Sequence, residues 1–317
     1  MNHQVAGHQE TTPKKTLVSR RPIELFALAG SLLLLVGCGG SNGTSSPGSG
    51  SGSGTVSGTA VYGSMNGAAV KALAVSNGAA GAQLGSATTD AQGNFTVAIG
   101  SYAGTLMLQV SGGTYTDDAT GTVMTMQSGD VMSAVLPTLA ANTATTGIQV
   151  TPLTSMAQAR AQNMAGGMTD ANVAAASAAM ASYFSIGDVL HTTPMNPLAP
   201  GSGAGATQDA KDYGMTIAAM SQYAATIGMP HSSGVITAMM DDASDGVMNG
   251  MMGGTSISMG GMGGMMGGGM MQATAGTASL ASAMTQFMAS ALNRSGVTAA
   301  DMQALVTRLG TSNGALQ

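Results

Sequence analysis

The sequence predicts an α+β protein in which the two kinds of structure follow one another along the chain. We expect an N-terminal antiparallel β-sandwich over residues 56–150 and an all-α, bundle-like domain over residues 151–317. Three observations lead to this prediction. Apolar and polar residues alternate with a period of two in the first half, turn residues separate these short segments, and the apolar period becomes helical after residue 150.

The composition excludes several classes of protein. The chain has 317 residues, one Cys, 7% charged residues and a formal net charge of −5. Nucleic-acid binders need a basic surface and disulfide-built scaffolds need paired cysteines, so neither class fits. Without residues 1–37 the chain keeps five Lys and Arg, twelve Asp and no Glu, a balance of 5 − 12 = −7. We therefore expect no nucleic-acid partner.

Residues 1–37 have the organisation of a secretory signal peptide. Two lysines and two arginines lie between residues 14 and 21, and an apolar run from Leu25 to Val36 follows. The run is shorter than the roughly 20 apolar residues that span a bilayer. It ends in Leu35-Val36-Gly37-Cys38, which resembles the lipobox of bacterial lipoproteins.

The lipobox resemblance implies that Cys38 is the site of lipidation. It implies transfer of diacylglycerol to the Cys38 thiol, cleavage after Gly37, and acylation of the new amino terminus. Gly39 follows the cysteine, where retention in the inner membrane commonly uses Asp, so the resemblance implies the outer membrane of a Gram-negative bacterium. Residues 38–55 are rich in Gly and Ser and predict a flexible tether with a reach of about 20–25 Å.

The period-two segments of the sandwich begin at Val56. Residues 95–99 and 106–110 alternate most clearly, and turns are expected at Asn66-Gly67, Asn77-Gly78 and Asp90–Gly93. The segment from Ala87 to Thr96 resembles the hallmark hairpin of carboxypeptidase-regulatory-like domains, which are small transthyretin-like sandwiches. The resemblance covers about residues 56–135 and implies that Asp90 and Gly93 make the turn while Phe95 enters the core.

Six helices are expected in the second half. Thr151-Pro152 predicts the start of the first helix, because Thr is a good N-cap and Pro suits the first helical position. The second helix is expected to begin at Thr169-Asp170, the third to cover residues 208–228, and the fourth to begin near Ser233. The last two are expected over residues 278–293 and 299–309, and the final helix is capped by Thr298 and ends at Gly310. Their apolar faces use Ala and Met, which suits close helix packing.

A segment rich in Gly and Met predicts a mobile loop at about residues 249–275. Twelve methionines lie between Met229 and Met271, and the glycines disfavour a helix there. Thioethers prefer Cu(I) over hard cations, and the segment resembles the Met-rich stretches of periplasmic copper-resistance proteins. The candidate metal ligands are Met259, Met262, Met265, Met266, Met270 and Met271.

Two alternative interpretations of this loop stay open: a low-complexity insertion that binds nothing, and a stretch of exposed Met that is sacrificially oxidised to the sulfoxide. His231, Asp241, Asp242 and Asp245 lie just upstream and could assist with Cu(II), although a solvated helix end also accounts for the three aspartates. No other cofactor is expected.

The sequence offers little for catalysis. The mature chain has two histidines and no Glu, and its one Cys lies in the lipobox. We therefore expect that the protein is not an enzyme, and we assign no catalytic residue. The sequence predicts a lipid-anchored envelope protein with a structural or binding role, held at the membrane by its N-terminal lipid, with its protein or envelope partner unidentified. The alternative is a lipoprotein that binds or sequesters Cu(I) or Ag(I).

Overall fold

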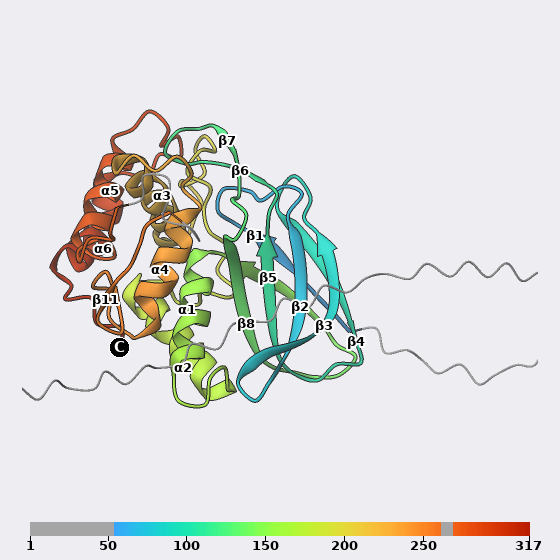
Figure 1. Cartoon of the computed structure of the whole chain (residues 1–317). Helices are drawn as coiled ribbons and strands as arrows, with labels where there is room; N and C mark the ends of the chain where they lie inside the picture. Colours follow the sequence, from blue (N-terminus) through green and yellow to red (C-terminus); the bar gives the residue numbers. More distant parts are fainter. Residues whose placement is uncertain (1–53, 261–268) are drawn as a thin grey trace, which may run out of the picture. The chain divides into compact units, whose positions relative to one another are not determined.

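The structure is a computed structural model, and it describes residues 54–260 and 269–317. Cys38, the signal peptide and most of the tether lie outside the described residues, as do Met262, Met265 and Met266. The described chain mixes β-strands and α-helices, with most strands before residue 151 and the helices after it (Figure 1).

The first half of the described chain forms strands that pair in three separate sheets. β1, β4 and β9 form one sheet in the order β4-β1-β9, four strands form a second in the order β3-β2-β5-β8, and β6 pairs with β7. The strands are β1 (Gly54–Ala60), β2 (Ala69–Ser76), β3 (Ala79–Thr88), β4 (Asn94–Gly100), β5 (Gly104–Ser111), β6 (Thr114–Thr116), β7 (Val123–Thr125), β8 (Val131–Leu139) and β9 (Ala144–Val150).

The alternation in the sequence accounts for the faces of these strands. Phe95, Val97 and Ile99 on β4 are buried, whereas the residues between them are exposed, as a half-buried strand requires. Side chains from the three-stranded and four-stranded sheets join one apolar cluster, for example Val97 and Leu108. Mixed α/β structure with antiparallel pairing is therefore confirmed.

One strand pair departs from the antiparallel arrangement that we predicted. β1 pairs with β4 antiparallel but with β9 parallel. Strands β1 and β9 come so close that a Cβ on Gly58 would lie 1.8 Å from the carbonyl oxygen of Ile148. Glycine is thus required at position 58, and the period-two pattern carried no information on the direction of the neighbouring strand.

The turn at residues 90–93 forms as expected, but it does not close a hairpin. Asp90 Oδ1 accepts hydrogen bonds from the backbone N–H of Gln92 (2.9 Å) and of Asn94 (2.8 Å). Gly93 has φ +85°, and Phe95 is buried. The flanking strands β3 and β4 belong to different sheets, so the turn carries the chain from one sheet to the other.

The helices largely match their predicted positions. They are α1 (Pro152–Asn163), α2 (Asp170–Tyr183), α3 (Gln208–Thr226), α4 (Gly234–Ser244), α5 (Ala278–Met288) and α6 (Ala299–Thr311). Thr151 caps α1 in a capping box with Thr154. α5 ends at Met288 rather than at residue 293, and the Asn293 side chain donates to the Met288 carbonyl (3.2 Å). α6 continues through Gly310 by one residue.

The described parts of the Gly- and Met-rich segment, residues 249–260 and 269–275, contain β-pairing that we did not expect. β10 (Met251–Met252) pairs with β11 (Thr255–Ser256). Beyond it, Met259 N–H donates to Gly269 and Met271 N–H donates to Ile257. These backbone bonds join the two ends of the segment on either side of residues 261–268.

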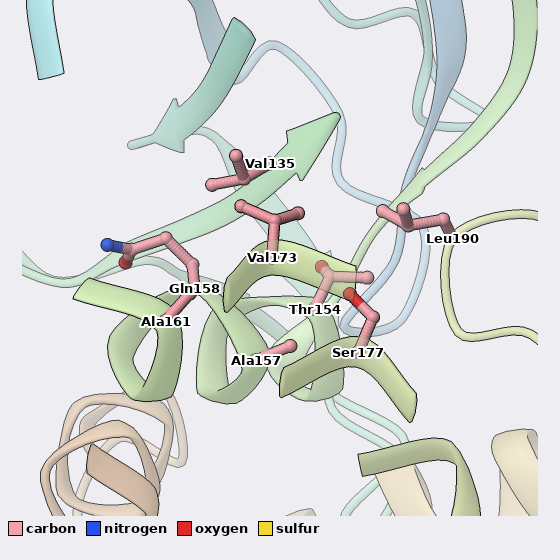
Figure 2. Close-up of a pocket in the computed structure, with 8 residues that line it drawn as sticks. All are labelled: Val135, Thr154, Ala157, Gln158, Ala161, Val173, Ser177 and Leu190. Atoms are coloured by element: carbon pink, nitrogen blue, oxygen red, sulfur yellow. The ribbon is translucent and has the colours of Figure 1, made fainter. Parts of the chain in front are cut away.

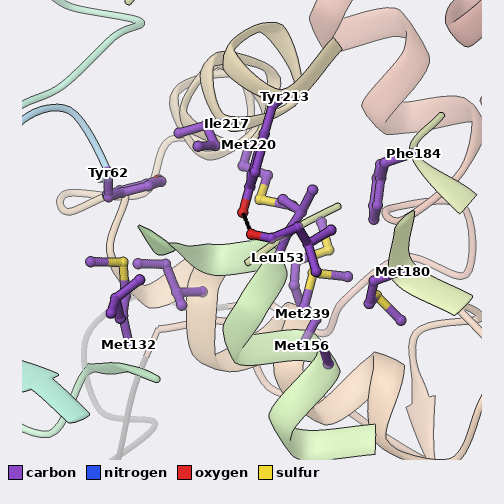
Figure 3. Packing of buried hydrophobic residues seen from close by; sticks show 14 of the residues in the cluster. Tyr62, Met132, Leu153, Met156, Met180, Phe184, Tyr213, Ile217, Met220 and Met239 are labelled. Carbon is purple, nitrogen blue, oxygen red and sulfur yellow. Dashed lines mark hydrogen bonds between the residues drawn. The ribbon is translucent and has the colours of Figure 1, made fainter. Parts of the chain in front are cut away.

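β9 ends at Val150 and α1 begins at Pro152, and the core is continuous across this point of the chain. α1 packs against β8 (Figure 1), and one apolar cluster holds side chains from both halves. Figure 3 shows Tyr213 of α3 directed toward Leu153 of α1, two members of this cluster. Across the described ranges, no helix has the length and apolar character needed to cross a membrane.

Candidate functional site

A cavity of about 180 Å³ lies where the end of β1, α3 and an extended segment before α3 meet. Its apolar wall is formed by Val61, Pro194, Met195, Pro197 and Ile217. Its polar wall is formed by Thr59, Ser64, Gln92, Asp118, Thr193 and Asn196. Asp118 is the one charged side chain among the described residues that line it.

The close fit of the extended segment against α3 shapes one side of this cavity. Met195 N–H donates to the carbonyl of Ala210 (2.9 Å). A Cβ on Gly214 would lie 2.0 Å from the Met195 carbonyl oxygen, so the segment approaches the helix only because residue 214 has no side chain. Gly214 therefore sets the position of the wall that carries Thr193 and Asn196.

The turn between β6 and β7 carries two adjacent aspartates, and the first of them is fully engaged. Asp117 Oδ1 accepts hydrogen bonds from the backbone N–H and the hydroxyl of Thr120 (both 2.9 Å). Asp117 Oδ2 accepts from Ser221 Oγ of α3 (2.6 Å) and from Ser232 Oγ just before α4. The carboxylate of Asp117 thus links the turn to the helical half of the protein.

Two tyrosines whose rings contact each other at a tilt complete this buried polar network. The rings of Tyr62 and Tyr115 lie 5.1 Å apart between centroids. Tyr62 donates to the Ser232 carbonyl (3.0 Å), and Tyr115 OH lies 3.0 Å from Ser232 Oγ. Burial is the main cause that raises the pKa of both phenols, so they remain neutral donors. The network holds the 117–122 turn, and with it Asp118, in one position.

Asp118 has a different environment from its neighbour. It is 4% exposed, lines the cavity, and makes no hydrogen bond with its side chain to any residue that the structure describes. Burial, followed by repulsion from the Asp117 carboxylate, raises the pKa of Asp118 to about 7. A buried carboxyl without a partner is costly, and perturbed groups of this kind in a cavity are typical of binding sites.

A second hollow in the structure has no room for a ligand. It lies between α1, α2 and β8, with Gln158, Val173 and Val135 on its walls (Figure 2). Its free volume is about 0 Å³. The side chains therefore close this crevice, and it carries no site.

The predicted metal ligands are only partly brought together. Met259 and Met271 are buried, whereas Met270 is 68% exposed. Because Ser258 pairs with Met270 in antiparallel fashion, Met259 and Met271 lie on the same face of this ladder and Met270 lies on the other. The ladder thus places two thioethers diagonally opposite each other on its buried face.

The upstream residues do not add a metal cluster. Asp242 is fully buried rather than solvated, and its Oδ1 accepts from the backbone N–H groups of Asn249 (2.8 Å) and Gly250 (2.6 Å). Asp245 accepts from backbone N–H groups of the same loop. Between residues 54 and 260 and after 268, no three His, Cys, Asp or Glu residues form a group that could hold a metal ion.

The site at Asp118 was missed at the level of sequence. The available signal was the adjacent pair Asp117-Asp118 directly after a strand in a chain with few charges. Periodicity and motif spacing carry no information on a cavity whose walls come from residues 59 to 217. No protein-family model matches this chain, and no curated protein matches it.

Proposed function

We propose that this protein is a lipid-anchored binding protein of the bacterial envelope, without enzymatic activity, that holds a small ligand in the cavity at Asp118. The observation that carries the proposal is Asp118, a residue only 4% exposed, which lines a cavity of about 180 Å³ and whose carboxyl group accepts no hydrogen bond from any described residue. A ligand that pairs with this carboxyl group would offset its desolvation cost.

The anchor is the second part of the proposal. The Leu35–Cys38 sequence and the positive n-region support lipidation of Cys38, and Gly39 supports the outer membrane. Two or more acyl chains are needed for stable attachment, which is the number that lipidation at a lipobox supplies.

Labelling with an alkyne-bearing fatty acid in a Gram-negative host tests the anchor. We expect the wild-type protein to incorporate label and to sediment with outer-membrane vesicles. Cys38→Ser removes the only thiol of the chain and is expected to abolish both signals, whereas the control Ser41→Ala, three residues further on, is expected to leave them unchanged. Equal labelling of Cys38→Ser and wild type would refute lipidation at this cysteine.

A second candidate function is soft-metal sequestration. It is favoured by one observation: Met259 and Met271 present two thioethers on one face of the ladder that closes the Met-rich segment. Thioethers suit Cu(I) and Ag(I). Deleting the segment would remove buried side chains, so substitution is the better test.

A Cu(I) competition titration of the full chain separates the two interpretations of the segment. We expect Met259→Leu/Met271→Leu to weaken Cu(I) binding at least tenfold, since Leu keeps the volume and loses the sulfur. The control Met132→Leu changes a buried methionine of β8 and is expected to leave Cu(I) affinity unchanged. No measurable Cu(I) binding by wild type would leave the segment without a metal function.

A further inference from the structure

We propose that the cavity at Asp118 takes a small organic cation, a primary or secondary ammonium compound whose charged group pairs with the Asp118 carboxylate. This inference rests on the proposed function of the cavity as a binding site and names the class of ligand. Three observations support the inference: the charge of the cavity walls, the chemistry of the residues that form them, and the size of the cavity.

The charge of the cavity selects a cation. Asp118 faces it without a hydrogen bond from any described residue, and no Lys, Arg or His lines it within the described part of the chain. The Asp117 carboxylate lies next to it and raises the cost of a second negative charge. An anionic ligand would be repelled by the Asp118 carboxylate, whereas an ammonium group neutralises it and donates up to three hydrogen bonds.

The chemistry of the walls selects an organic body for this cation. Val61, Pro194, Pro197 and Ile217 form an apolar side, which a hydrated inorganic ion would leave without contacts. Asn196 also lines the cavity, and its Oδ1, which accepts from the backbone N–H of Leu198 (2.9 Å), has a second lone pair that can accept from an ammonium N–H. The combination of one carboxylate, few polar groups and an apolar wall is typical of a small-molecule site.

The volume limits the size of the ligand. The cavity measures about 180 Å³, and an apolar cavity of about 150 Å³ is enough to hold one benzene molecule. A ligand of roughly six to ten non-hydrogen atoms therefore fits. Larger amines require movement of the 193–197 segment, which is clamped to α3 by the Met195–Ala210 hydrogen bond.

The groups around Asp118 predict how binding depends on pH. Asp117 on the same turn is the charged neighbour, and Tyr62 beyond the end of β1 stays neutral because its pKa is raised by burial. The residues of α3 that line the cavity are uncharged. Arg294 is close in the fold, since its backbone N–H donates to the Pro197 carbonyl, but its side chain is exposed. Binding of an ammonium ion should therefore follow the ionisation of Asp118 and strengthen as the pH rises through about 7.

Calorimetric titration of the lipidated full chain in detergent tests the inference with three probes of equal ring size: cyclohexylammonium, cyclohexanol and cyclohexanecarboxylate. At pH 8 we expect cyclohexylammonium to bind at least tenfold more tightly than cyclohexanol, and the carboxylate not to bind. Lowering the pH from 8 to 5.5 should weaken cyclohexylammonium binding by roughly 30-fold, since the ionised fraction of a group with a pKa of about 7 falls by that factor.

Two variants test whether Asp118 is the residue that binds the ammonium group. Asp118→Asn is expected to lose at least tenfold in cyclohexylammonium affinity and most of the pH dependence while remaining folded. The control Asp241→Asn changes another half-buried carboxyl whose pKa is raised by burial but which lies outside the cavity, and is expected to bind as wild type does.

The outcomes distinguish the inference from the proposed function. If cyclohexanol binds as tightly as cyclohexylammonium, or if Asp118→Asn keeps full affinity, the cavity is a binding site but the cation inference is wrong. If none of the three probes binds wild type, the cation inference fails, and a screen of uncharged fragments of the same size that also finds no binder would remove the proposed binding function itself.

Discussion

Replacing Asp118 with Asn is expected to stabilise the protein at neutral and alkaline pH. The folded state raises the pKa of Asp118 from 3.8 to about 7, so folding favours the protonated carboxyl. The contribution of this group to stability is fully present below pH 3.8 and is lost as the pH rises through about 7. An Asn amide has nearly the same shape and carries no charge at any pH.

The size of the effect follows from the pKa shift. The difference between 3.8 and about 7 is about 3 units, and each unit corresponds to 1.36 kcal/mol, so the ionised carboxylate costs up to about 4 kcal/mol at pH 8. Water that enters the cavity hydrates the carboxylate and reduces this figure. Near pH 4 the wild type and Asp118→Asn are expected to differ by less than about 1 kcal/mol.

Urea unfolding followed by far-UV circular dichroism, at pH values from 4 to 9, measures the free energy of unfolding of both proteins. Asp212 and Asp242, whose pKa values are also raised, to about 6, are common to both and cancel in the difference. Asp90→Asn should behave in the opposite sense and lose stability at pH 7, since hydrogen bonds from Asn94 lower the pKa of Asp90. A stability difference between wild type and Asp118→Asn that does not change with pH would refute the reasoning.

Three further predictions concern the scaffold, each read from the same unfolding curves at pH 7. Asp117→Asn weakens the hydrogen bonds that tie the turn to the helical half, and we expect it to lower the free energy of unfolding by about 2–4 kcal/mol; an unchanged value would mean that the network is not formed. Gly58→Ala puts a Cβ 1.8 Å from the Ile148 carbonyl and should cost at least about 2 kcal/mol, whereas Gly205→Ala, with nothing within 4 Å, should be neutral. Thr151→Ala removes the N-cap of α1 and should cost about 1–2 kcal/mol; a loss near zero would contradict the role of the cap.

Local features of the chain were predicted well. Thr151-Pro152 marked the start of α1, and Thr169 marked the start of α2, because a cap acts on backbone N–H groups only a few residues away. The alternation over Phe95–Ile99 predicted which side of β4 is buried. The Asp90–Gly93 turn forms for the same local reason, since the Asp90 side chain bonds to backbone N–H groups within four residues.

Features that depend on distant residues were predicted less well. The Met-rich segment was expected to be a mobile loop because its glycines disfavour a helix, yet Met259 and Met271 are buried in the core. What orders them is contact with the rest of the protein, which supplies more burial than local propensity takes away. The large apolar cluster shared by the sheets and the helices has the same origin.

The amino-acid order alone was enough to establish the mixed α/β class, the succession of strands and helices, and most helix starts, because periodicity and capping are interactions between near neighbours. It was not enough for the parallel pairing of β1 with β9, which joins residues about 90 positions apart, nor for the cavity at Asp118, whose walls come from residues 59 to 217. Those features arise when distant segments pack, since only then does one aspartate of an adjacent pair gain four donors while the other is left facing a cavity.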